Sequence, residues 1–303
     1  MSRTKGAKNK KYLLPDGSYG RKSEALGLIA MPLEASTLTP TRSDSEVLAL
    51  IRERFKVFGI LIDGAISGNV RSLIAAGAPG VGKSNLVFKK LEHAVTCGTT
   101  QHRVVSGGLS PVALYKLGYE MSRAGSVIVL DDADDILDDP EGLTILKALC
   151  DSGEERTVHW LKETDLVDED GEKVPKSYPF EGTMIFITNR NIQKIIEEGK
   201  SRMASHLKAL SDRSLYLDLL IHDRQQLGVW VNHIASEGRI FTNEEMTESQ
   251  GDIIMEYINR NRMQLLNLSL RTIVNACDLM KTADSIGEEF ELLANNTLLR
   301  RVR

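Results

Sequence analysis

Short apolar runs alternate with longer amphipathic stretches between residues 44 and 218. A run that is apolar throughout is typical of a buried parallel strand, whereas apolar positions three and four apart indicate a helix packed by one face. Strands and helices in regular alternation predict a three-layer α/β domain with a mostly parallel five-stranded sheet over residues 45–220. The predicted strands are 72–76, 103–106, 127–130, the run ending in "FITN" and the run after "SDR".

The helices of this region have recognisable starts. An amphipathic helix is expected over 44–67, and another follows the glycine-rich turn that ends at Gly82. Ser110 before Pro111 is a start signal, because Ser caps free N–H groups and Pro is tolerated in the first turn. Asp139 before Pro140 repeats this pattern, and its helix should run to about residue 150.

Helical periodicity continues without strands after residue 220. Three apolar stripes, in "RQQLGVWVNHIASEG", "GDIIMEYINRN" and the helix that starts near Arg271, predict a helical lid with a basic tail over residues 221–303. Trp230 and Met255 lie on these stripes, and we interpret both as core residues.

The first 44 residues have a different composition. Seven Lys and Arg residues stand against the single acid Asp16 in the first 22 positions, and Pro, Gly and Ser interrupt any periodicity. Residues 1–44 therefore predict a disordered basic arm and linker. Clustered positive charge attracts phosphates, so contact with nucleic acid and a merely solvated tail are equal alternatives here.

The strongest chemical signal is "GAPGVGKS", which follows the first predicted strand and starts a helix. Its glycines let backbone N–H groups point inward, and the helix N-terminus adds partial positive charge, so the loop can bind phosphates. Lys83 can reach the β- and γ-phosphates, and the Ser84 hydroxyl can bind Mg²⁺. The residues expected to hold the nucleotide are Gly77, Ala78, Pro79, Gly80, Val81, Gly82, Lys83, Ser84 and Asn85.

Four aspartates follow the third strand in "VIVLDDADDIL". Ligands of open parallel sheets gather at the carboxyl ends of strands, so Asp131 and Asp132 should emerge beside the phosphate loop. Asp131 is expected to act on Mg²⁺ through water. Asp132 stands where many ATPases place the glutamate that activates the attacking water, and it is shorter by one C–C bond, about 1.5 Å. Asp134 and Asp135 are interpreted as solvated, and they are the next candidates for the base.

Residues 45–284 resemble the AAA+ superfamily, whose motifs are matched in order by "GAPGVGKS", "VIVLDD", "FITN", "LSDR" and "LSLR". Strings such as "GGLSPVALY" also resemble AAA+ proteins encoded by bacteriophages. The resemblance implies a P-loop core with a helical lid, Mg²⁺-dependent hydrolysis of ATP to ADP and phosphate, and a homo-oligomer, typically a ring. It also implies that Asn189 holds the lytic water, that Arg213 is an arginine finger for the neighbouring subunit, and that Arg271 is a second sensor. Arg202 and Arg224 are the rival fingers.

The connection before the "FITN" strand is longer than a simple loop. Asp170–Gly171 is a turn signal between extended stretches, so residues 157–181 predict a hairpin insert, which resembles the pre-sensor-1 hairpin of AAA+ helicases and initiators. Its acidic tip would repel phosphates, so contact with DNA would come from its base, near Trp160, Lys173 and Lys176. The loop "SGGLSP" also lacks the pore aromatic of peptide-threading unfoldases.

Two functions stay open at this point: a DNA-directed motor or replication-protein loader, which we favour, and a protein-remodelling or ATP-gated adaptor ATPase. The net charge of -4 argues against a uniformly basic nucleic-acid binder. Three widely spaced cysteines suggest neither a disulfide framework nor a zinc site. No apolar run approaches the roughly 20 residues of a membrane helix, so we expect a cytoplasmic protein without a membrane partner, in the host cytoplasm if phage-encoded.

Overall fold

The computed structural model describes residues 12–13, 19–20, 42–162, 165–168, 171–200, 203–219, 221 and 223–300. The chain divides into two compact units, residues 1–43 and 44–303. In the first unit, strand β1 (Tyr12–Leu13) pairs antiparallel with β2 (Tyr19–Gly20). The rest of the predicted basic arm and the last three residues of the basic tail lie outside the described residues.

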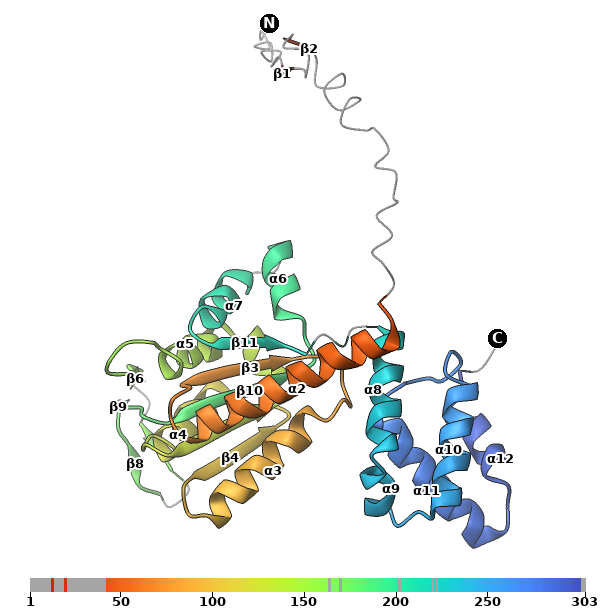
Figure 1. Cartoon of the computed structure of the whole chain (residues 1–303). Coiled ribbons are helices and arrows are strands. Elements are labelled where there is room, and N and C mark those ends of the chain that lie inside the picture. Colours follow the sequence, from red (N-terminus) through yellow and green to blue (C-terminus); the bar gives the residue numbers. More distant parts are fainter. Residues whose placement is uncertain are drawn as a thin grey trace, which may run out of the picture. The chain divides into compact units, whose positions relative to one another are not determined.

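The second unit is built on a five-stranded sheet (Figure 1). The strands lie in the order β11–β3–β10–β5–β4, and every neighbouring pair is parallel. The predicted α/β class with a mostly parallel five-stranded sheet is therefore confirmed, and the carboxyl ends of all five strands share one edge. The strands are β3 (Ser72–Ala76), β4 (Gln101–Ser106), β5 (Ser126–Asp131), β10 (Thr183–Thr188) and β11 (Leu215–Asp218).

Helices cover both faces of this sheet and make it the middle of three layers (Figure 1). Successive strand residues point to opposite faces, so Leu73 belongs to the core on one side and Ile74 to the core on the other. The first core is closed by α2 (Asp44–Ile66) and α3 (Lys83–Thr96). The second is closed by α4 (Pro111–Glu120), α5 (Pro140–Leu149) and α7 (Ala204–Ser211), while α6 (Ile192–Glu198) lies beside α7.

The predicted helix starts agree with the structure. The Ser110 hydroxyl accepts a hydrogen bond from the Ala113 N–H, and the Asp139 carboxylate accepts from two N–H groups in the first turn of α5. Val95 lies off the buried stripe of α3 and is 44% exposed, although its position beside Ala94 in the sequence suggested the same face. The packed stripe of α3 runs through Val87, Leu91 and Ala94, and the next residue lies about 100° further round the helix.

The insert before β10 forms two short antiparallel pairs rather than one continuous hairpin. Strand β6 (Thr157–His159) pairs with β9 (Ser177–Pro179), and β7 (Leu166–Val167) pairs with β8 (Lys173–Val174). Glu163, Glu169 and Asp170 of its predicted acidic tip lie outside the described residues.

The base of the insert is less open to a nucleic acid than its composition suggests. Trp160 is only 6% exposed, because it packs against Tyr115 and lies under the ammonium group of Lys162. The Lys173 ammonium is paired with Asp165 at 2.9 Å. Among the three residues considered for DNA contact, the Lys176 side chain is the one for which the described contacts record neither an aromatic packing partner nor an ion pair.

The C-terminal part of the second unit is entirely helical. Its helices are packed around a core of their own, to which Ile254, Ile273 and Cys277 contribute, and Met255 packs against it as predicted. The expected boundary near residue 220 stays a prediction, because residues 44–303 form one compact unit. No helix of the described ranges is long and apolar enough to cross a membrane. The helices are α8 (Arg224–Ser236), α9 (Arg239–Asn243), α10 (Glu248–Arg260), α11 (Leu270–Ile286) and α12 (Phe290–Thr297).

Candidate nucleotide-binding site

A cavity of about 720 Å³ lies between the loop after β3 and the helical lid. At its apolar end the rings of Phe55 and Trp230 stack with centroids 4.4 Å apart and planes 18° apart, and His233 lies against Trp230 at 5.6 Å. Aromatic and aliphatic walls of this kind suit a flat heterocycle. At its other end the cavity reaches the loop residues Pro79 to Asn85, with Asp132, Asn189 and Arg271.

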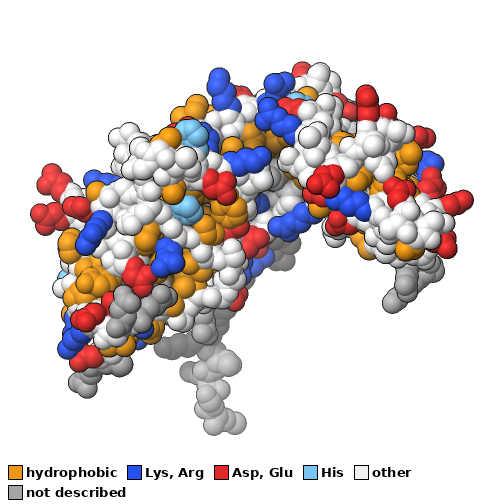
Figure 2. Space-filling model, turned by 90° about the horizontal axis from the view of Figure 1, so that it is seen from below, with side chains coloured by type: hydrophobic (Ala, Val, Ile, Leu, Met, Phe, Trp, Pro, Cys, Tyr) orange, Lys and Arg blue, Asp and Glu red, His pale blue; other side chains and the backbone are white. Residues whose placement is uncertain are grey.

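Positive charge surrounds this cavity. Its lining includes six Lys and Arg side chains for which no ion pair is recorded in the described part of the chain. Three carboxylates also line it, of which Glu244 is paired with Lys281 and Glu237 lies beside His233. In the space-filling view, Lys and Arg side chains gather around the hollow in the middle of the molecule (Figure 2). This excess of positive charge suits an anionic ligand. The six basic residues are Arg52, Lys56, Lys83, Lys89, Arg239 and Arg271.

The loop between β3 and α3 needs its glycines. Gly80 has φ of 68° and Gly82 has φ of 100°, in the left-handed region that side chains disfavour. A Cβ atom on Gly80 would also lie 2.8 Å from the Cβ of Ser269 in the lid. Gly82 is the N-cap of α3 and provides no side chain to the helix, so the first N–H groups of α3 lack a side-chain cap and are suited to bind phosphate oxygens.

Lys83 is 5% exposed, and its ammonium group has three hydrogen-bond acceptors. Nζ donates to the carbonyl of Gly77 at 2.8 Å, to the carbonyl of Ala78 at 2.9 Å and to Oδ1 of Asn189 at 2.8 Å. Burial lowers the pKa of Lys83 from 10.5 to about 8, and the nearby carboxylates of Asp132 and Asp131 oppose this shift. A phosphate would replace one or more of these acceptors and favour the charged form.

Ser84 and Asp131 lie side by side. The Ser84 hydroxyl donates to Oδ1 of Asp131 at 2.8 Å, and burial raises the pKa of Asp131 although this hydrogen bond opposes the shift. A hydroxyl and one carboxylate fit Mg²⁺, which usually takes one or two protein ligands and completes its shell with water and phosphate oxygens.

Asp132 has φ of 54°, a left-handed conformation that non-glycine residues seldom adopt. Its N–H donates to the Ile187 carbonyl at 3.0 Å, and its Oδ1 accepts from Nδ2 of Asn189 at 2.7 Å. The amide of Asn189 thus connects Lys83 to Asp132. Uncommon backbone conformations often mark functional positions, and this one directs the short carboxylate of Asp132 toward Asn189.

The lid donates hydrogen bonds to main-chain carbonyls of the phosphate loop. Trp230 Nε1 donates to the Val81 carbonyl at 2.9 Å, and the Leu270 N–H donates to the Gly80 carbonyl at 2.9 Å. Arg271 follows Leu270 and lines the cavity, and its charge contributes to lowering the pKa of Lys83. Trp230 is therefore both a core residue and part of the site, and its second role was missed in the sequence.

Arg213 lies apart from this group. It precedes β11, at the amino edge of the sheet, where Ser214 and Ser72 are 2.8 Å apart through their hydroxyls. Its Nε donates to Oδ1 of Asp151 at 3.2 Å and its Nη1 to the Ala209 carbonyl at 2.8 Å. Of the rival fingers, Arg202 lies outside the described residues, and Arg224 is held by main-chain carbonyls of residues 262 and 265.

The expectation that Asp134 is solvated was wrong. Its carboxylate bonds to Thr188 and Arg190, which flank Asn189 in the sequence, whereas Asp135 is exposed as expected. The four consecutive polar residues of "TNRN" at the end of an apolar strand were the available signal, but their partner could not be identified without the fold.

No family model matches the chain. A protein of Enterobacteria phage T4, described as an uncharacterized 36.7 kDa protein in the nrdC–mobD intergenic region, is 33% identical over 239 residues, which cover 79% of this chain and 72% of the phage protein.

Solved structures resemble the chain only distantly. Domain III of the Thermotoga maritima replication initiation protein DnaA has a TM-score of 0.47 at 15% identity, covering 80% of this chain and 91% of that one. The Aeropyrum pernix ORC1 protein in complex with DNA has a TM-score of 0.42 at 14% identity, covering 84% of this chain and 62% of that one. The fold is instead evident from the sheet order, the phosphate loop and the helical lid of this chain. The chain belongs to the family of the T4 protein, and its parallel sheet, phosphate loop and helical lid form the fold that the resemblance in its sequence motifs implied.

Proposed function

We propose that this protein binds and hydrolyses Mg·ATP as an oligomer. The observation that carries the proposal is the continuous set of contacts at the phosphate loop, in which Asn189 joins Lys83 to Asp132 while Ser84 joins Asp131. These are the side-chain types that phosphoryl transfer requires, since its catalysis consists mainly of positioning and electrostatic stabilisation.

Each side chain has a stated role in this proposal. The N–H groups of Gly80, Gly82 and the first turn of α3 bind phosphate oxygens, and Lys83 adds a point charge. Ser84 and Asp131 hold Mg²⁺, which neutralises charge on the phosphates when bound. Asn189 orients the attacking water and Asp132 accepts its proton. Arg271 supplies positive charge from the lid.

The oligomer is part of the proposal because Arg213 stands at the opposite edge of the sheet from the other residues. Its side chain is 35% exposed, and among the contacts of the described residues only Nε and Nη1 of the guanidinium have partners. A second subunit placed against the amino edge would receive this group at its own phosphate site. A closed ring is the symmetric way to repeat such a head-to-tail contact.

For the client, we propose DNA or a replication protein in the host cytoplasm, supported by the basic arm and the basic tail of the sequence. The alternative is a protein-remodelling or ATP-gated adaptor function. It is favoured by one specific observation, since Trp160 is packed inside the base of the insert and Lys173 is already paired with Asp165.

The experiment has two readouts. Mg·ATP binding by calorimetry and phosphate release test the ATPase, and absence of both would overturn it. Binding to single- and double-stranded DNA is then measured from 50 to 200 mM salt, with and without residues 1–23. Contact through several phosphates should weaken steeply with salt, on the order of tenfold or more over this range, and should depend on the arm. Binding of no DNA at the lowest salt would favour the protein-directed function.

A further inference from the structure

A second group of hydrogen bonds surrounds Asn189 without involving its side chain. The Thr188 hydroxyl donates to Oδ1 of Asp134 at 2.8 Å and accepts the Arg190 N–H at 3.0 Å. The Nε of Arg190 lies 3.3 Å from Oδ2 of Asp134. One carboxylate therefore holds the residue before Asn189 and the residue after it. We call Asp134, Thr188 and Arg190 the Asp134 brace.

The brace is anchored on a short 3₁₀ helix. Asp134 is the first residue of η1 (Asp134–Asp138), and Asp138 is its last. Arg190 bonds both oxygens of Asp138 through Nη1 and Nη2, each at 2.8 Å. The side chain of Asp138 is 60% exposed, whereas that of Asp134 is 20% exposed. Solvent screens the outer ion pair, so the inner contacts of Asp134 should matter more for geometry.

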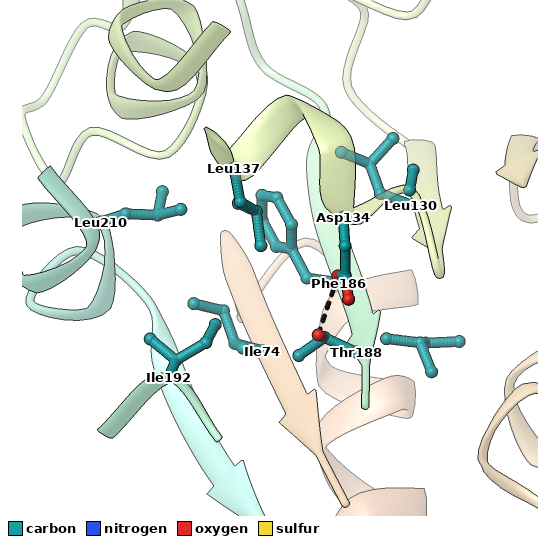
Figure 3. Close-up of a pocket in the computed structure, with 10 residues that line it drawn as sticks. Ile74, Leu130, Asp134, Leu137, Phe186, Thr188, Ile192 and Leu210 are labelled. Carbon is teal, nitrogen blue, oxygen red and sulfur yellow. Dashed lines mark hydrogen bonds between the residues drawn. The ribbon is translucent and has the colours of Figure 1, made fainter. Parts of the chain in front are cut away.

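The surroundings of the brace leave it little freedom. Asp134 and Thr188 point toward each other beside a small space lined by apolar side chains (Figure 3). Burial raises the pKa of Asp134, while its contacts with Thr188 and Arg190 oppose this shift. Both carboxylate oxygens have partners, so a displacement of the 188–190 backbone would leave a polar group unpaired in an apolar setting. The apolar lining includes Ile74, Leu130, Leu137, Phe186, Ile192 and Leu210.

We propose that the Asp134 brace is a positioning device for Asn189. It holds the main chain of residues 188–190 so that the amide of Asn189 spans Lys83 and Asp132, and none of its three members lines the proposed nucleotide cavity. This inference rests on the proposed role of Asn189 in ATP hydrolysis. The sequence pattern offers Asp134 only as an alternative base and assigns Arg190 no role, because the brace exists only where η1 meets the end of β10.

The test compares two substitutions at Thr188, which is 2% exposed. Thr188→Val keeps the shape and removes the hydroxyl, so turnover at saturating Mg·ATP should fall on the order of tenfold, because sub-ångström misplacement of a catalytic group slows the reaction. The dissociation constant for Mg·ATP should stay within about twofold, since Lys83 and the loop are untouched. Thr188→Ser keeps the hydroxyl, so this variant should turn over ATP at close to the parent's rate. Asp138→Asn, which weakens only the outer ion pair, is the matched control and should retain the parent rate.

A double variant separates positioning from general stability. If the brace acts through Asn189, adding Thr188→Val to Asn189→Ala should slow turnover no further than Asn189→Ala alone. Full turnover by Thr188→Val, or an additional loss of similar size in the double variant, would overturn the inference. If Thr188→Val does not fold, Asp134→Asn replaces it, since it keeps the shape and loses the charge that Arg190 contacts. If the parent protein does not turn over ATP, the proposed function itself is wrong. If Asn189→Ala is slow while Thr188→Val is fully active, only the proposed role of the brace is wrong.

Discussion

The two edges of the parallel sheet carry their charged side chains in opposite ways. At the carboxyl edge, Lys83, Asn189 and Asp132 are joined to one another by hydrogen bonds of 2.7–2.8 Å. At the amino edge, Arg213 is bound to Asp151 and to a main-chain carbonyl, and it has no recorded contact with that group. The strand β3 spans roughly 13 Å between the edges, at about 3.3 Å per residue.

This difference indicates that a complete catalytic site could be divided between two subunits. An arginine side chain at the amino edge is too far from its own phosphate loop to act there, yet it is presented at the surface of the sheet domain. The carboxyl edge of one chain therefore has every proposed catalytic group except the arginine finger. The comparison predicts that substitutions at the two edges produce different defects, and that mixed subunits can combine them.

The largest effect is expected at the amino edge. Arg213→Ala should bind Mg·ATP as the parent does but hydrolyse it about 1000-fold more slowly, because an arginine finger acts on transition-state charge. Arg71→Ala is the matched control, since Arg71 lies at the same edge and bonds only to carbonyls of residues 152 and 153. Phosphate release per folded subunit measures both.

Mixing two inactive variants tests the same prediction more directly. Combining inactive Arg213→Ala with inactive Lys83→Ala subunits should restore part of the activity, because some interfaces then contain one intact loop and one intact finger. A fully active, monomeric Arg213→Ala protein would contradict the division between the edges.

At the carboxyl edge, Lys83→Ala should weaken Mg·ATP binding about 100-fold, corresponding to roughly 3 kcal/mol for lost charge-assisted hydrogen bonds. The fold should persist, because the apolar cores on the two faces of the sheet are built from other side chains. Calorimetry measures the affinity, and Lys90→Ala, which removes an exposed pair with Asp63, provides the control. Equal affinity in Lys83→Ala and the parent would remove the basis of the proposed function.

Asp132 tests the proton acceptor. Asp132→Asn should bind Mg·ATP normally and lose turnover by about 100-fold, the usual contribution of a general base. Asp132→Glu should keep or raise turnover with a small loss of stability, because φ of 54° suits Asp better than Glu. Asp135→Asn is the exposed control. If Asp132→Asn turns over ATP at the parent's rate, Asp132 is not the proton acceptor.

The smallest effect is one of pH. Since burial lowers the pKa of Lys83 to about 8 and bound phosphate raises it, Mg·ATP affinity should be constant below pH 8 and fall above it, by up to about tenfold per pH unit. In the ligand-free protein the sign is opposite: between pH 8 and 10.5 the unfolded chain holds the extra proton, so the free energy of unfolding rises with pH. Lys83→Arg, which stays protonated, should bind without this dependence.

Local patterns predicted most of the sheet domain. The strand 72–76 and the capped starts at Ser110 and Asp139 agree with the structure, because apolar runs and capping residues act within a few positions. The resemblance also predicted Lys83, Asp131 and Asn189 as neighbours at one edge of the sheet. Helix α12 and the division of the insert into two strand pairs were not predicted, since neither depends on a strong local signal.

The phosphate loop follows from local sequence, because a glycine-rich turn between an apolar strand and a helix N-terminus needs no distant partner to form. The contact between the lid and that loop depends on the folded chain, since a hydrogen bond from Trp230 to Val81 joins residues 149 positions apart. The tertiary structure also decided that Asp134 belongs to Thr188 and Arg190 rather than to solvent. Hydrogen bonds between distant segments depend on where the sheet and lid bring them together, and residue type and spacing along the chain do not contain that information.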